Sequence, residues 1–150
     1  MSLVADVRTT PRSRTNPQYN LDVLPQSLAS FNVRYEHLSQ LGGRRPRQPA
    51  VPVSVNAFWQ NASFHNYADY ALSESFHSGL ARLRELGRDH RCAIMCSETL
   101  WWRCHRRIIT DHLLAAGQTV RHILGPHEIL PADMTPAARQ DNTGNVVYPA

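Results

Sequence analysis

The side chains best suited to chemistry in this 150-residue sequence lie within one short stretch: Cys96, Glu98, Cys104, His105 and Arg106. A cysteine is nucleophilic as its thiolate, and nearby cationic groups or the N–H groups at the start of a helix lower the pKa of a thiol. Glutamate and histidine act as general acids or bases when their surroundings adjust their pKa. The stretch therefore predicts a site for thiol chemistry, with Glu98 or His105 transferring the proton.

Structural roles are an alternative for the same residues. Free cysteine is among the most buried residue types, so Cys96 and Cys104 could fill the core, as we expect Cys92 to do. Glu98 could cap the helix that follows it or pair with an arginine. These alternatives stay open at the level of the sequence.

A metal site is a further alternative, because Cys96, Cys104 and His105 supply three soft ligands. Structural zinc sites normally pair two cysteines only about two to four residues apart, which this spacing does not match. His122 or His127 would have to complete the set. We therefore assign no cofactor and keep zinc as an alternative.

All sixteen basic residues are arginine, and the formal net charge is +4. A coding bias toward arginine explains this, as does a partner rich in phosphate or carboxylate groups, which guanidinium binds bidentately. A nucleic acid would suit the arginine groups and the nearby aromatic residues, but no nucleic-acid-binding motif of standard spacing occurs. The groups are Arg12 and Arg14; Arg44, Arg45 and Arg47; and Arg103, Arg106 and Arg107, with Tyr19, Trp59, Trp101 and Trp102 available for stacking.

The composition, 42% hydrophobic and 19% charged, is that of a globular protein. We expect a single α/β domain over residues 1–130, with an irregular loop at 42–57 and an irregular or partly disordered tail at 131–150. No apolar run is long enough to cross a bilayer, and the first residues lack the pattern of a signal peptide. Three cysteines, an odd number, indicate free thiols in a reducing cytoplasm.

Strands and helices are expected to alternate along the chain. This order predicts an α/β fold with a mostly parallel sheet of about four strands and helices on both faces. The expected strands are 3–8, 32–38, 91–98 and 120–124. The first expected helix begins at 20 or 22 and ends near 30, and two further helices cover 66–87 and 104–116.

Ligands of open parallel sheets bind beyond the carboxyl ends of the strands. Asp6 and Arg8 follow the first expected strand, and Cys96 and Glu98 follow the third. We therefore expect these side chains to meet at one edge of the sheet. Asp6 and Arg8 could equally form a structural ion pair.

Several motifs occur in a fixed order along the chain: Asp6-Val7-Arg8-x-x-Pro11-x-Ser13-Arg14, Leu41-Gly42-Gly43-Arg44, Tyr67-Ala68-Asp69-Tyr70, Met95-Cys96-Ser97-Glu98 with Cys104-His105-Arg106, and Gly117 with Val120-x-His122-Ile123. Together these motifs resemble the bacterial and archaeal family called domain of unknown function 488. The resemblance implies a Rossmann-like, three-layer α/β fold and a thiol-containing site of uncharacterised activity. It carries over onto Asp6, Arg8, Ser13, Arg14, Cys96, Glu98, Cys104, His105 and Arg106.

One part of the family pattern is missing. Members usually carry a strand–turn–helix unit with a Gly-His-Ser-like motif ahead of the Asp-Val-Arg strand, and this sequence begins at that strand. We expect a sheet with one strand fewer. An exposed sheet edge of this kind favours a homodimer.

The function these observations favour is a thiol-dependent hydrolase or transferase acting on a phosphate-bearing or nucleic-acid-related substrate. Cys96 or Cys104 would be the nucleophile, with Glu98 and His105 as the other expected catalytic residues. The alternatives are a non-catalytic nucleic-acid or nucleotide-binding module and a Cys/His metal site. The residues expected to bind the anion or substrate are Asp6, Arg8, Ser13, Arg14, Arg44 and Arg106.

Overall fold

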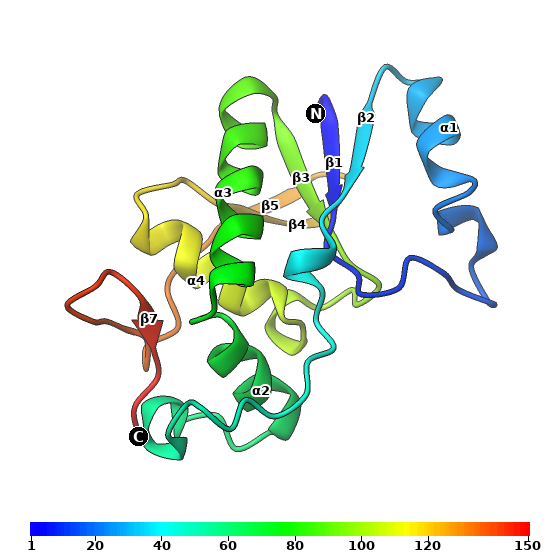
Figure 1. Ribbon diagram of the computed structural model, residues 1–150. Coiled ribbons are helices and arrows are strands. Elements are labelled where there is room, and N and C mark those ends of the chain that lie inside the picture. Colours follow the sequence, from blue (N-terminus) through cyan, green and yellow to red (C-terminus); the bar gives the residue numbers. More distant parts are fainter.

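The centre of the molecule is a parallel sheet of three strands, shown in Figure 1 by a computed structural model of residues 1–150. β1 (Leu3–Asp6) lies between β2 (Arg34–His37) and β3 (Cys92–Met95). All four residues of β1 are buried, as expected for the central strand of a parallel sheet. The expected mixed α/β fold with a parallel sheet is confirmed.

The fourth expected strand is present but does not join this sheet. β4 (Arg121–Gly125) pairs antiparallel with β5 (Glu128–Pro131) across a two-residue turn. Such a short connection can only produce a hairpin, because a parallel neighbour needs a long crossover. The sheet therefore has three strands rather than about four, and β3 is one of its edges. These elements do not establish the expected Rossmann-like, three-layer arrangement.

The helix expected over 66–87 is two helices, α2 (Ala62–Tyr70) and α3 (Glu74–Asp89). The break follows from Ser73, whose hydroxyl accepts a hydrogen bond from the N–H of Phe76 at 3.2 Å and so caps a new helix. The remaining α-helices are α1 (Leu24–Ala29) and α4 (Arg106–Ala115). Short 3-10 helices occupy Pro17–Tyr19, Ser39–Leu41, Val53–Asn56 and Trp101–Arg103.

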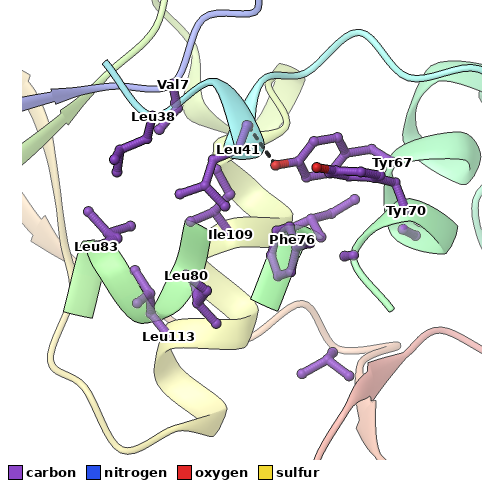
Figure 2. Close-up of a cluster of buried hydrophobic side chains, with 14 of the residues drawn as sticks. Val7, Leu38, Leu41, Tyr67, Tyr70, Phe76, Leu80, Leu83, Ile109 and Leu113 are labelled. Carbon is purple, nitrogen blue, oxygen red and sulfur yellow. Dashed lines mark hydrogen bonds between the residues drawn. The ribbon is translucent and has the colours of Figure 1, made fainter. Parts of the chain in front are cut away.

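The main core lies where α3 and α4 meet the sheet, and Figure 2 shows its side chains. Phe76, Leu80 and Leu83 recur every three or four residues and so form one apolar face of α3. Ile109 and Leu113 of α4 belong to the same cluster. This packing fixes the start of α4 relative to the carboxyl end of the sheet.

The segment 131–150 contributes to the same core. β6 (Arg139–Gln140) pairs with β7 (Val146–Val147), and Val146 and Tyr148 are fully buried. The Tyr148 hydroxyl donates to Asp111 of α4 at 2.6 Å. Residues 42–57 are largely irregular apart from one short 3-10 helix. No helix in the structure has both the length and the apolar character needed to cross a membrane.

Candidate thiol site

Three of the four expected catalytic side chains form one cluster at the carboxyl end of β3. Cys96 follows the last residue of that strand, and Cys104 and His105 immediately precede α4. The two sulfur atoms and one ring nitrogen of His105 all lie within 4.8 Å of one another. The 3-10 helix at Trp101–Arg103 turns the chain back, which brings positions eight residues apart into contact.

His105 is oriented by the backbone of Val7, the residue that follows β1. Its Nε2 lies 2.9 Å from the carbonyl oxygen of Val7. Because a carbonyl only accepts hydrogen bonds, Nε2 carries the proton, and in the neutral ring Nδ1 keeps a free lone pair. That Nδ1 lies 3.5 Å from Cys104 Sγ. The arrangement places a general base beside a thiol, with a third group fixing the base.

Gly43 allows the loop that begins at residue 42 to approach His105. A Cβ atom at Gly43 would stand only 2.5 Å from the Nδ1 atom of His105. The backbone of Gly43 has no positive φ, so the glycine is required by space and not by conformation. The sequence contained this glycine only as part of a motif, and nothing in its spacing pointed to the histidine.

Arg106 directs two N–H donors at the Cys104 sulfur. Its backbone N–H lies 3.4 Å from Sγ and its side-chain Nε lies 3.2 Å away. The same guanidinium donates to the carbonyl oxygen of Glu98. Because α4 begins at Arg106, Cys104 stands just ahead of the positive end of the helix dipole. Both features act to lower the pKa of the Cys104 thiol.

The two thiols titrate as a pair that holds one negative charge. A hydrogen bond from the Cys104 thiol lowers the pKa of Cys96, with help from His105 and the Glu98 N–H, while burial opposes the change. The same hydrogen bond raises the pKa of Cys104, and burial and the Cys96 charge raise it further, although Arg106 opposes this. The first proton therefore leaves the pair easily and the second does not.

A cavity of about 430 Å³ opens above this cluster. Its lining contains four arginines and one glutamate, so the space favours an anion. Three of the expected substrate-binding residues, Arg8, Ser13 and Arg44, line it, whereas Arg14 and Arg106 do not. The lining residues are Arg8, Thr9, Thr10, Arg12, Ser13, Gly43, Arg44, Ser63, Phe64, Tyr67, Cys96, Ser97, Glu98, Arg103, Cys104 and His105.

Asp6 supports Arg8 from below the cavity. Asp6 is fully buried, and Arg8 donates to its two carboxylate oxygens at 2.9 Å from Nε and 2.7 Å from Nη2. Burial alone would raise the pKa of Asp6, but hydrogen bonds from Arg8 and Tyr35 outweigh it and hold the pKa below its ordinary value. Arg8 Nη2 also donates to the Tyr19 carbonyl oxygen. The pair therefore fixes one cationic side chain in the cavity wall.

Two further arginines, Arg12 and Arg103, line the cavity without having been among the expected site residues. Both occurred in the arginine groups of the sequence, which was the available signal. Glu98 also lines the cavity, and its Oε1 accepts a hydrogen bond from the Leu100 N–H at 3.0 Å. Glu98 thus stabilises the turn before Trp101 and leaves its other oxygen without a partner inside the chain.

The residues proposed to complete a zinc site do not reach the cluster. His122 stacks on Trp101 with a centroid distance of 4.0 Å and an interplanar angle of 5°. His127 is exposed in the turn between β4 and β5. Only Cys96, Cys104 and His105 come together, so the cluster lacks the fourth protein ligand of a structural zinc site.

The family model for the domain of unknown function DUF488 matches residues 1–113. The chain belongs to the DUF488 family. The matched residues include the whole thiol cluster and the walls of its cavity. No curated protein and no solved structure matches the chain.

Proposed function

We propose that this DUF488 protein is a cytoplasmic thiol-dependent hydrolase or transferase whose substrate carries a phosphate group. One observation carries the proposal: Cys96, Cys104 and His105 meet within 4.8 Å at a cavity lined by four arginines. A reactive thiol, a proton acceptor and several anion-binding groups at one place are the parts that nucleophilic catalysis on an anionic substrate requires.

Cys96 is the nucleophile in this proposal. It is half-buried and faces the cavity, whereas Cys104 is only 4% exposed. The Cys104 thiol and the Glu98 N–H stabilise the Cys96 thiolate. Cys104 in turn is held by Arg106 and lies next to His105 Nδ1. Cys104 therefore acts as a positioning residue between the nucleophile and the base.

The bonds formed and broken can be balanced with these groups. The first proton to leave the thiol pair passes to His105 Nδ1, so that Cys96 is a thiolate and Cys104 keeps the second proton. The Cys96 thiolate then attacks phosphorus as the bond from phosphorus to the leaving oxygen breaks. His105 returns the proton to that oxygen. Water then cleaves the S–P bond in a hydrolase, or a second acceptor takes the phosphoryl group in a transferase. The arginines of the cavity balance the charge of the phosphate oxygens.

Site-resolved alkylation with iodoacetamide tests the proposal, because Cys92 provides an internal control outside this cavity. Cys96 is expected to react at a pH well below the ~8.5 of a free thiol. Burial raises the pKa of Cys92, so that residue reacts only at higher pH. Inorganic phosphate is expected to slow the reaction of Cys96 more than that of Cys92. Equal pH profiles for the two cysteines, without protection by phosphate, would reject the proposal.

A non-catalytic nucleotide-binding or nucleic-acid-binding module is the second candidate, and the arginine-lined cavity favours it independently of the thiols. A module of this kind retains phosphate binding after Cys96→Ser and Cys104→Ser, and its affinity falls steeply with salt. The enzyme proposal instead requires a covalent adduct of the substrate on Cys96. Mass spectrometry of acid-quenched mixtures with phosphate esters or anhydrides separates the two.

A further inference from the structure

A second cavity, of about 330 Å³, lies beside β3 and shares no lining residue with the first. Its walls come from α3, β3, α4 and the β4 strand of the hairpin. We propose that this second cavity binds a small anion with a flat heterocyclic ring, of the nucleoside monophosphate class. The volume is in the range of small-molecule sites, roughly 300–1,000 Å³.

The charge of the second cavity is unbalanced. No aspartate or glutamate is among its lining residues, which include Arg84, Arg91 and Arg121. None of these three arginines takes part in an ion pair within the chain. The Nε atom of Arg84 is moreover buried and has no hydrogen-bond partner. A buried donor without a partner is costly, and a phosphate oxygen would satisfy it.

His122 adds a second buried polar atom without a partner. Its side chain is only 9% exposed, it lines the cavity, and its Nε2 makes no hydrogen bond. Burial, and then the charge of Arg106, lower the pKa of His122, so the ring is neutral at pH 7. The neutral ring stacks on Trp101, which also lines the cavity. The wall therefore combines an aromatic surface with an unused polar nitrogen.

The free edge of β3 supplies donors and acceptors for a heterocycle. The carbonyls of Arg91 and Met95 accept hydrogen bonds from the β1 side, at 2.9 Å from the Ser2 N–H and 2.9 Å from the Val7 N–H. Because peptide groups alternate in direction along a parallel strand, those of Cys92 and Ile94 point away from β1. Cys92 and Ile94 both line the second cavity. Their N–H and C=O groups match the alternating polar edge of a nucleobase.

The same charge argues against a second copy of this chain as the occupant of that edge. A partner strand from another copy would bring its own Arg84, Arg91 and Arg121 to an edge that already carries three cations without carboxylate partners. Like charges brought together across an interface repel one another. An acidic extended peptide would avoid the repulsion. Only a side chain of that peptide, and not its backbone, would reach the buried Nε of Arg84 and Nε2 of His122. A compact anion with a ring reaches these atoms directly.

Cysteine footprinting provides the test, because Cys92 lines the second cavity while Cys96 and Cys104 line the first. Iodoacetamide labelling near pH 9, read by peptide mass spectrometry, is carried out with adenosine monophosphate, adenosine, inorganic phosphate or a poly-glutamate peptide. We expect the monophosphate to slow labelling of Cys92 at least fivefold and adenosine or phosphate alone to protect it less. In the sample with adenosine monophosphate, labelling of Cys96 is expected to change less than that of Cys92.

Arg121→Gln tests the anion contact on an exposed residue that makes no ion pair within the chain. We expect it to abolish the protection of Cys92, whereas Arg139→Gln, outside both cavities, retains it. His122→Phe preserves the stack on Trp101 and is expected to weaken protection. Protection of Cys96 instead of Cys92, protection by the peptide alone, or no protection at Cys92 would each overturn the proposal. Because Cys96 reports on the first cavity, failure here is distinct from failure of the thiol mechanism.

Discussion

Replacement of Arg106 by glutamine is expected to make the thiol pair harder to ionise. The guanidinium Nε lies 3.2 Å from Cys104 Sγ, and glutamine removes its charge while the backbone N–H at 3.4 Å remains. An opposite charge at such a distance changes a pKa by roughly one to three pH units, and partial exposure of Arg106 favours the lower part of that range. We therefore expect the midpoint of the alkylation profile to rise by about one to two pH units.

The assay is iodoacetamide labelling of Cys96 and Cys104 as a function of pH, with Cys92 replaced by alanine. Below the midpoint, each pH unit of displacement lowers the thiolate population about tenfold, so the labelling rate should fall by roughly 10- to 100-fold at fixed acidic pH. Arg107→Gln is the matched control, because its Nε bonds Thr135 at 3.0 Å and makes no hydrogen bond to the thiols. Identical profiles for the two variants would refute the role assigned to Arg106.

Three further predictions concern the site and the core. Gly43→Ala is expected to slow thiol labelling, because its Cβ would meet the His105 ring at 2.5 Å; urea unfolding of the variant shows whether the loss is local. Burial lowers the folded-state pKa of His112 to about 3. Below the ordinary pKa of histidine the unfolded chain binds a proton that the folded chain does not, so the unfolding free energy decreases as the pH falls through that value. Between pH 7 and pH 5 the unfolding free energy should decrease by about 2 kcal/mol, and this part of the decrease should be absent in His112→Leu. Tyr148→Phe removes a donor from buried Asp111, at 2.6 Å, and should lower the unfolding free energy by about 1.5–3 kcal/mol in urea titrations. An unchanged unfolding midpoint for Tyr148→Phe would mean that Asp111 does not depend on that hydrogen bond.

The parts of the fold that the sequence predicts well are those set by local hydrophobic pattern. The apolar run at 92–96 indicated a strand, and the three- and four-residue spacing around Leu80 and Leu83 indicated a core-facing helix. The strand was expected to be buried, but β3 is only half-buried because it lies at an edge of the sheet. A strand at 120–124 was also expected and corresponds to β4, yet its partner strand β5 was not expected. A strand pattern carries no information on which edge it pairs with, and here a short turn favours the hairpin over the sheet.

The candidate site was predictable in position but not in detail. The rule that ligands bind at the carboxyl ends of parallel strands selected Cys96, and the start of α4 selected Cys104 and His105. The contact between Gly43 and His105 joins residues 62 positions apart in the chain, which no spacing rule reaches. The second cavity depends in part on β3 being an edge strand, and the sequence predicted about four strands without predicting which of them lie at the edges.

Arg106 connects the thiol cluster with the second cavity, because its guanidinium donates a hydrogen bond to Cys104 and the same residue lines that cavity. An anion that draws this guanidinium toward the second cavity removes charge stabilisation from the thiolate. Proton binding by the thiols and anion binding by the second cavity are then thermodynamically linked, and each changes the affinity of the other by the same factor. Through Arg106, the pKa of the thiol pair therefore depends on whether an anion occupies the second cavity.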